Sequence, residues 1–221
     1  GQLCETFRLP RQRVRVIVPD TGGGFGGKHT GEVAVEAARL AKSAGRPVHL
    51  RWTREEEFTW AYFRPAGLIE VSAAIDDSGT LTGWDFTNYN SGGSAIDTPY
   101  NVPNGRTRFL ACDVPLRQGS YRALASTANV FARESAMDEM ALLAGTDPLE
   151  FRLRHLGPGR LRDALTAAAE KFQWSSRVRD RQPNRGIGLS CGTEKGSYTA
   201  ACAEVEVIDD EVRVLSVCQS F

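Results

Sequence analysis

The feature that most constrains this chain is a run of glycines between an apolar segment and an amphipathic one. Thr21-Gly-Gly-Gly-Phe-Gly-Gly-Lys28 holds five glycines in six residues around one phenylalanine, and it follows the apolar run Val14-Arg-Val-Ile-Val18. Glycines at this density let backbone N–H groups approach an anionic ligand closely, and a strand that leads into a helix start aims those donors at one point. The sequence therefore predicts a loop that binds a phosphate-bearing cofactor.

A helix between two strands is predicted around this loop. Residues 13–18 alternate Arg and Val before the segment becomes fully apolar, which is typical of a strand that enters a sheet. Residues 32–44 carry apolar side chains on one helical face and are followed by Gly45, so they predict a helix. Residues 48–52 predict the next strand, and together these segments predict a β-loop-α-β unit.

The rest of the chain predicts helices and antiparallel strands. The turn Asp76-Asp-Ser-Gly79 predicts a hairpin between residues 67–75 and 80–90, and the long connection over 91–115 is typical of functional loops. The remaining predicted elements are a short strand over 108–112, helices over 126–144, 148–156 and 161–172, and strands over 186–191, 199–208 and 211–218, with a hairpin at Asp209-Asp210. This mixture favours an α+β fold, with mixed sheets and packed helices, over a regular doubly wound sheet.

A glycine-proline-glycine triplet marks the predicted boundary between two lobes. Gly157-Pro-Gly159 precedes the helix predicted over 161–172, and a polar stretch over 175–185 follows that helix. We expect a first lobe over residues 1–156, which carries the glycine loop, and the incomplete start of a second α+β lobe over 157–221. Neither end of the sequence shows a clean element boundary, which indicates a fragment of a longer protein.

Composition argues against several function classes. Lys plus Arg and Asp plus Glu number 27 each, so the chain lacks the basic field that nucleic-acid binding usually needs. Five cysteines are scattered and form no C-x-x-C pair, which favours reduced thiols in a cytoplasmic protein and offers no iron–sulfur or zinc site. His29 and His49 stand apart from other metal-binding side chains, so we expect no metal ligated directly by this chain. The sequence has no apolar run long enough to predict a membrane span, and its start does not resemble a signal peptide.

Two better-known glycine motifs fit the loop by pattern, and each lacks a partner residue. Gly22, Gly24 and Gly27 satisfy the dinucleotide-binding pattern G-x-G-x-x-G, but the next predicted strand ends at Trp52 without the acid that binds the ribose. The same glycines with Lys28 satisfy G-x-x-x-x-G-K, but a histidine follows where a hydroxyl should bind Mg²⁺. A loop without any ligand, whose glycines serve close packing, is a third interpretation, although so many glycines cost conformational entropy.

Further segments, taken in chain order, resemble one family. The glycine loop continues into His29-Thr-Gly-Glu32, and the other segments are Arg46-Pro-Val-His-Leu-Arg-Trp-Thr-Arg-Glu-Glu-Glu57, Phe63-Arg-Pro65, Gly119-Ser-Tyr-Arg-Ala123, Glu134-Ser-Ala-Met-Asp-Glu139 and Gly145-Thr-Asp-Pro-Leu-Glu-Phe-Arg152. Over most of residues 10–155 the chain resembles the molybdopterin-binding, large subunit of the xanthine dehydrogenase and aldehyde oxidase family. It is most like the bacterial isoquinoline or aldehyde oxidoreductase subunits, and the likeness over 175–221 is looser.

The resemblance implies roles for the loop and for one arginine. In this family the loop supplies backbone contacts to the cofactor, and the N–H of its phenylalanine lies beside the apical oxo group of molybdenum. The residues thus implied as cofactor-binding are Gly23, Gly24, Phe25, Gly26 and Gly27. An arginine that follows an aromatic residue lines the family's substrate pocket, so Arg122 would orient the substrate and stabilise negative charge that develops on it. Ala123-Leu-Ala125 stand where glycines or a phenylalanine often follow, so an aromatic clamp on the substrate is not expected.

The resemblance also implies an activity. The chain would be part of a two-lobed molybdenum-cofactor-binding domain in a molybdenum hydroxylase, which hydroxylates an aldehyde or an N-heterocycle. The cofactor would be molybdopterin, with its cytosine dinucleotide form as one option, whereas iron–sulfur clusters and FAD would lie on other domains or on iron–sulfur and flavin partner subunits. The family's general-base glutamate falls outside these residues, so we expect the fragment alone to be inactive. The alternative function is a non-catalytic module that binds a nucleotide or phosphate through the same loop.

Overall fold

The computed structural model describes residues 1–180 and 182–221. Contacts between Cα atoms divide these residues into two compact units. Unit 1 comprises Gly1–Pro65 and Asp113–Leu124, and unit 2 comprises Ala66–Cys112 and Ala125–Phe221. The boundary predicted between residues 156 and 157 lies within unit 2, and the division of the longer protein into two lobes stays a prediction.

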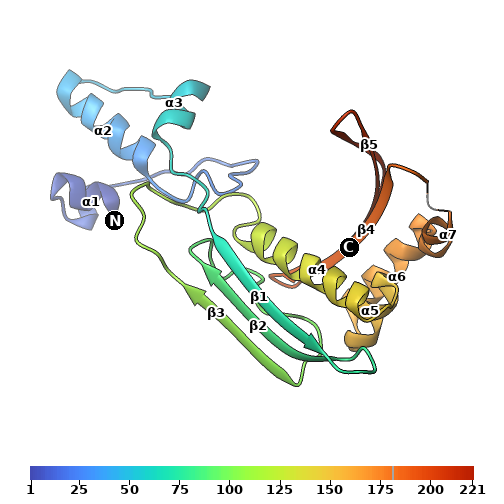
Figure 1. The fold of residues 1–221 in the computed structure, drawn as a ribbon. Helices are drawn as coiled ribbons and strands as arrows, with labels where there is room; N and C mark the ends of the chain where they lie inside the picture. The colour runs from blue at the N-terminus through green and yellow to red at the C-terminus, as the bar shows by residue number, and fades with distance from the viewer. Residues whose placement is uncertain (181) are drawn as a thin grey trace. The chain divides into compact units, whose positions relative to one another are not determined.

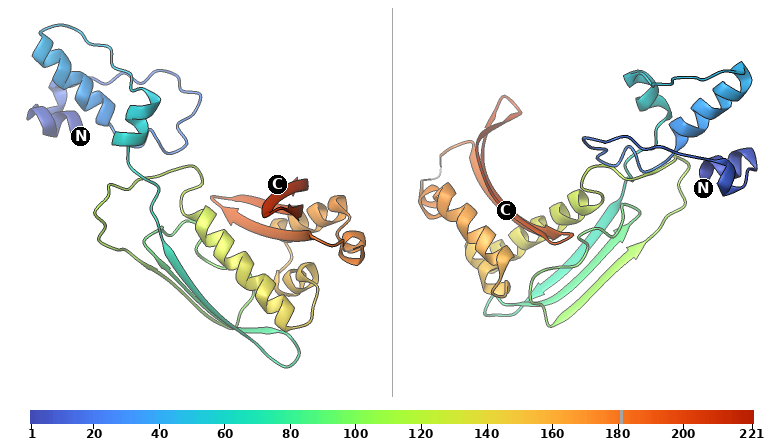
Figure 2. Two further views of the ribbon diagram at one scale, coloured as in Figure 1. Left: turned by 45° about the horizontal axis from the view of Figure 1, so that its top comes forward. Right: turned by 180° about the vertical axis from the view of Figure 1, so that it is seen from behind.

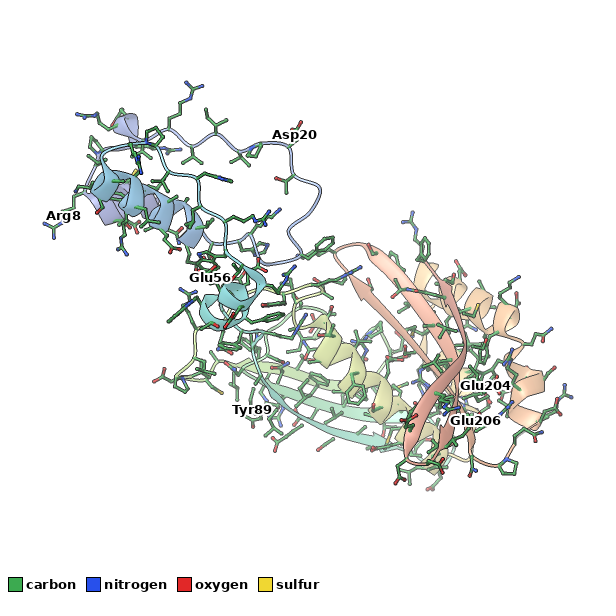
Figure 3. The ribbon with its side chains drawn as sticks, turned by 90° about the horizontal axis from the view of Figure 1, so that it is seen from above. Arg8, Asp20, Glu56, Tyr89, Glu204 and Glu206 are labelled. Carbon is green, nitrogen blue, oxygen red and sulfur yellow. The ribbon has the colours of Figure 1, made fainter. Side chains whose placement is uncertain are left out.

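Unit 1 consists of short helices joined by extended segments. Its helices are α1 (Gln2–Phe7), the 3₁₀ helix η1 (Arg11–Arg13), α2 (Glu32–Ala44) and α3 (Arg54–Trp60). The predicted helix over 32–44 is confirmed, and Gly45 ends it in the left-handed region at φ 64°. Helix α3 begins with a capping box, in which Thr53 accepts from the N–H of Glu56 and the Glu56 carboxylate accepts from the N–H of Thr53. Figure 3 labels Glu56 on this helix.

The strands predicted on either side of the glycine loop are wrong. Within the described residues of unit 1, neither 13–18 nor 48–52 pairs with another strand, so the predicted β-loop-α-β unit is absent. The side chains of Val16, Ile17 and Val18 are 62%, 74% and 78% exposed. The alternation of Arg and Val expresses a local preference for extended backbone, but a strand also needs a neighbour to satisfy its N–H and C=O groups.

The first sheet of unit 2 contains the predicted hairpin. Strands β1 (Leu68–Ile75) and β2 (Leu81–Tyr89) pair antiparallel, and β3 (Asn104–Leu110) lies parallel to β2 and starts earlier than the strand predicted over 108–112 (Figure 1). Asp76 stabilises the turn, because its Oδ1 accepts from the N–H groups of Ser78 and Thr80, each at 2.9 Å.

Helices and a second sheet complete unit 2. They are α4 (Ser126–Leu143), α5 (Pro148–His155), α6 (Arg160–Phe172), α7 (Trp174–Arg179), β4 (Arg185–Glu194), β5 (Ser197–Ile208) and β6 (Glu211–Ser220) (Figure 2). The three strands form an antiparallel sheet that α6 covers, and α4 contacts both β1 and β4. The predicted helices, strands and β5–β6 hairpin are confirmed, whereas α7 occupies part of the stretch expected to be an irregular polar connection.

The hydrophobic core of the described chain lies in unit 2. The largest fully buried apolar side chains include Phe86, Phe151, Leu81, Met137 and Leu165. Two glutamates of β5 form ion pairs: Arg185 Nε donates to Glu206 Oε1 at 3.1 Å, and Arg177 of α7 pairs with Glu204. Figure 3 labels both glutamates. The neighbouring strand β6 leaves Val212, Val214 and Val217 exposed. Mixed sheets with packed helices confirm the predicted α+β class. No helix in the described part of the chain is long and apolar enough to cross a membrane.

A buried ion cluster connects three elements of unit 2. The Glu134 carboxylate on α4 accepts from Arg133 Nε at 3.1 Å and from Arg152 Nε at 2.9 Å. The Tyr100 hydroxyl and the N–H of Cys191 on β4 also donate to this carboxylate, at 3.0 Å and 3.2 Å. Arg133 and Arg152 are 1% and 0% exposed. Buried charges are tolerated when they are paired and hydrogen-bonded, so this cluster specifies how α4, α5 and β4 pack.

Candidate cofactor-binding site

The glycine loop of unit 1 is a pair of tight turns with unused donors. The N–H of Gly27 donates to Gly24 O at 2.9 Å, the N–H of His29 donates to Gly26 O at 3.3 Å, and Lys28 Nζ donates to Gly23 O at 2.7 Å. No described residue accepts a hydrogen bond from the N–H of Phe25. An exposed, unpaired backbone donor in a glycine-rich turn is suited to an anionic or oxo ligand.

A Cβ added at either of two glycines would meet close contacts, and of the two only Gly26 meets backbone. Gly26 has φ 101°, and a Cβ on it would lie 2.6 Å from Tyr121 Cα and would clash with the carbonyl of Ser120. A Cβ on Gly23 would lie 2.8 Å from the Phe25 ring. Gly22, by contrast, has nothing within 4 Å of its Cβ position. The loop therefore needs Gly26 because backbone segments far apart in the sequence meet there.

The structure brings the predicted residues Phe25 and Arg122 together. The Arg122 guanidinium lies 5.2 Å from the centroid of the Phe25 ring, which is within cation–π distance. Phe25 is 66% exposed and has a left-handed backbone at φ 48°. Arg122 is exposed, and its guanidinium makes no hydrogen bond or ion pair to any residue in the described ranges, so its donors are accessible to a ligand.

Tyr62 holds the glycine loop in place. Its hydroxyl donates to Gly26 O, and its ring meets the Tyr121 ring edge-to-face at 5.9 Å between centroids. A Cβ on Gly119 would lie 2.6 Å from Cγ of Tyr62 and closer still to two other ring atoms, so this glycine permits the close approach. Burial, followed by the nearby Glu32 carboxylate, raises the pKa of the Tyr62 hydroxyl, which therefore remains a donor.

The segment that carries Arg122 is held by Arg64. Arg64 Nη2 donates to Arg122 O and Nη1 donates to Leu124 O, each at 2.7 Å. The Arg64 guanidinium also lies 5.6 Å from the Tyr121 ring centroid. A short bridge fixes the chain next to Arg64, because the N–H of Phe63 donates to Arg117 O at 2.9 Å. Two segments that are distant in the sequence thus form one face beside the glycine loop.

Sequence reasoning missed Tyr62 and Arg64 as site residues. Phe63-Arg-Pro65 and Gly119-Ser-Tyr-Arg-Ala123 stood among the segments of the resemblance, but no pattern indicated that they contact each other. The sequence held one usable signal, since a charged side chain such as Arg64 is seldom buried in a core and can bind other groups at the surface. Arg64 is exposed in this structure. Within the described residues, no group of three or more His, Cys, Asp or Glu side chains could hold a metal ion.

The face offers hydrogen-bond donors and a positive charge to an oxygen-bearing ligand. It offers the unpaired N–H of Phe25, side-chain-free backbone at the neighbouring glycines and one cation, Arg122, above the loop. Lys28 Nζ, which a phosphate cradle would turn toward its ligand, donates instead to Gly23 O within the loop. Dipoles of this kind orient an oxo-bearing group without competing as its ligands.

Comparison with known proteins identifies relatives. The family model of the molybdopterin cofactor-binding domain matches residues 1–156. An aldehyde oxidoreductase molybdenum-binding subunit of Escherichia coli is 31% identical over 235 residues, which cover 93% of this chain and 32% of that protein. A nicotinate dehydrogenase chain of Pseudomonas putida is 29% identical over 194 residues, which cover 77% of this chain and 16% of that protein.

Solved structures agree with this fold. Quinoline 2-oxidoreductase from Pseudomonas putida 86 aligns with a TM-score of 0.73 at 22% identity, over 96% of this chain and 34% of that chain. The aldehyde oxidoreductase from Desulfovibrio desulfuricans aligns with a TM-score of 0.66 at 23% identity, over 88% of this chain and 25% of that one. The chain thus spans about a third or less of each relative and neighbour named above.

These matches leave the nucleotide- or phosphate-binding alternative without support. The family model covers more than half of the chain, and its range contains the glycine loop, Tyr62, Arg64 and Arg122. This chain therefore belongs to the molybdopterin cofactor-binding domain family of the xanthine dehydrogenases and aldehyde oxidoreductases.

Proposed function

We propose that the loop face of unit 1 binds the molybdenum cofactor and presents it to a small substrate. The observation that carries this proposal is the unpaired N–H of Phe25 in the glycine loop, together with the Arg122 guanidinium that lies over the Phe25 ring. The N–H of Phe25 would donate to an oxygen on the metal, and Gly23, Gly24, Gly26 and Gly27 would let the backbone approach the pterin.

Arg122 would bind the substrate in the same face. A guanidinium offers several donors in a fixed plane, which suits a carbonyl or a ring nitrogen and stabilises negative charge as it develops on the substrate. The Phe25 ring would hold this guanidinium by its π-face, so that its N–H groups stay directed at the substrate. The bound cofactor supplies the oxygen-transfer and two-electron chemistry of the reaction.

The full protein would hydroxylate an aldehyde or an N-heterocycle. The names of the relatives support this class, since they include aldehyde oxidoreductase, nicotinate dehydrogenase and isoquinoline 1-oxidoreductase. A glutamate base would come from a part of the longer protein that this chain does not include. We further propose the cytosine dinucleotide form of the cofactor, partner subunits that hold iron–sulfur clusters and a flavin, and a cytoplasmic location, the last in keeping with five free cysteines.

Metal analysis of the full-length protein, purified with its partner subunits, tests cofactor binding. We expect stoichiometric molybdenum together with pterin. A preparation that retains a nucleotide but contains neither molybdenum nor pterin would overturn the proposal.

Two variants of the full-length protein test the site residues. Phe25→Ala and Arg122→Ala should lower turnover by about a hundredfold while the fold remains intact. Phe58→Ala and Arg8→Ala are matched controls, because Phe58 and Arg8 are exposed side chains of unit 1. Unchanged kinetics for both Phe25→Ala and Arg122→Ala would contradict the assignment of the face.

A further inference from the structure

The backbone directly after Arg122 adopts a conformation that its own residues disfavour. Ala123 and Leu124 are both left-handed, with φ 65° and φ 51°. A Cβ in this region lies too close to the following carbonyl, so residues other than glycine enter it only when their surroundings hold them there. Two such residues in succession indicate that something outside this turn determines its shape.

Arg64 is the side chain that holds the turn. Its fork spans the strained segment, because one Nη donates to the carbonyl before Ala123 and the other to the carbonyl of Leu124, both at 2.7 Å. Within the turn, the N–H of Leu124 donates to Tyr121 O at 2.8 Å. An ammonium group is a point charge and does not match two carbonyls in this way, so the site favours arginine over lysine.

Arg64 is itself held by backbone and ring contacts. The N–H of Gly119 donates to Phe63 O at 3.0 Å, which fixes the residue before Arg64 against the segment that leads to Arg122. The Arg64 guanidinium also lies over the Tyr121 ring, at 5.6 Å from its centroid. A displaced Arg64 would therefore change both the ring and the turn on either side of Arg122.

We propose that Arg64 is a positioning residue, which fixes the left-handed turn at Ala123 and Leu124 and thereby holds the Arg122 guanidinium over Phe25. This inference rests on the proposed function of Arg122. It assigns to Arg64 no contact with cofactor or substrate. Its effect passes through the backbone carbonyl of Arg122 and through the Tyr121 ring.

The test uses the full-length protein with its partner subunits, loaded with cofactor. Arg64→Ala should leave molybdenum and pterin content unchanged, lower kcat/KM for an aromatic aldehyde by about tenfold to a hundredfold, and speed hydrogen exchange over residues 119–124. Arg64→Lys should give a smaller loss. Arg54→Ala is the matched control, because Arg54 is an exposed arginine of unit 1 that pairs with Glu57. Unchanged exchange and unchanged kinetics in Arg64→Ala would overturn the proposal.

Two double variants separate positioning from a general structural role. In the Arg122→Ala background, Arg64→Ala should lower kcat/KM no further, whereas additive losses would overturn the proposal. Adding Ala123→Gly to Arg64→Ala should recover part of the lost kcat/KM, because glycine adopts φ 65° without strain. No recovery would overturn the role of the turn. If Arg122→Ala alone leaves the kinetics unchanged, the proposed function fails, while the exchange rate of 119–124 in Arg64→Ala still decides whether Arg64 holds the turn.

Discussion

The two units of this chain are stabilised in different ways. In unit 2, two sheets and the helices α4, α5 and α6 enclose a core of fully buried aromatic and aliphatic side chains. In unit 1, Tyr62 is the single described residue that is buried, at 5% exposure. The shape of unit 1 depends on the Tyr62 hydroxyl, the Arg64 side chain and a few glycines that permit close backbone contacts. The proposed cofactor site therefore lies in the unit that has little core of its own.

This difference has a thermodynamic meaning. Burial of apolar surface is the main favourable contribution to the free energy of folding. Unit 2 buries much apolar surface, whereas unit 1 buries little. The exposed segment Val16–Val18 and the exposed residues Phe58 and Trp60, at 73% and 66%, show how much apolar surface unit 1 leaves open. Substitutions in each unit test this contrast, and we expect their effects to decrease in the order given below.

The buried ion cluster of unit 2 should be the most sensitive position. Arg152→Ala would leave the Glu134 carboxylate buried without one of its partners, which we expect to cost about 3–5 kcal/mol of unfolding free energy. Urea denaturation of the full-length protein measures this loss, with hydrogen exchange in α4 and α5 as the probe of unfolding. Arg160→Ala, at an exposed position that starts α6, is the control and should change the unfolding free energy little. If Arg152→Ala and Arg160→Ala lowered the unfolding free energy equally, burial of Arg152 in the ion cluster would not matter for stability, which would contradict this prediction.

Two leucines compare the cores of the units directly. Leu165 on α6 is 0% exposed, and Leu165→Ala should cost about 2–5 kcal/mol through lost burial and the resulting cavity. Leu40 on α2 is 43% exposed, and Leu40→Ala should cost less than about 1 kcal/mol. Chemical denaturation of both variants gives the two values. A loss for Leu40→Ala as large as that for Leu165→Ala would mean that unit 1 has a substantial core when the rest of the protein is present.

Glycine substitutions test what holds unit 1 together. Gly26→Ala forces a Cβ into the backbone of Ser120 and Tyr121 at a positive φ, which should cost about 1–3 kcal/mol and reduce the molybdenum content of the purified protein. Gly22→Ala is the control, since nothing lies within 4 Å of its Cβ position. Molybdenum analysis of both variants decides the matter. If Gly26→Ala retains full occupancy, the contact between the loop and Ser120 is not needed for cofactor binding.

A pH dependence from the core of unit 2 should be the weakest of these effects. Burial raises the pKa of the Cys191 thiol to about 12, from an ordinary value of 9.0. The unfolded chain loses this proton near pH 9 and the folded chain keeps it. The contribution of the Cys191 thiol to the unfolding free energy is therefore complete below pH 9. It declines as the pH rises, by about 1 kcal/mol between about pH 9 and about pH 10. Denaturation at both pH values, with Cys191→Ala as the reference, measures it. An identical pH dependence in the two proteins would contradict this assignment.

Much of unit 2 could be predicted from the sequence, because its signals are local. The hairpin at Asp76–Gly79 and the helices α4, α5 and α6 each depend on residues a few positions apart. The extra helix α7 was missed, since its six residues look like a polar connection. In unit 1, the helix over 32–44 was predicted for the same reason, whereas neither predicted strand forms, because strand pairing needs a partner that no local pattern reveals.

For the candidate site, the glycines around Phe25 predicted a loop that binds a phosphate-bearing cofactor, and the family resemblance named the molybdenum cofactor and the role of Arg122. The geometry came from the tertiary fold. It placed Arg122 beside Phe25, the Tyr62 hydroxyl on Gly26 O and the fork of Arg64 across the turn at Ala123 and Leu124. Residue type fixes which bonds a side chain can make. Which groups meet depends on contacts between distant segments, from 36 positions apart for Tyr62 and Gly26 to 97 for Phe25 and Arg122 (122 − 25).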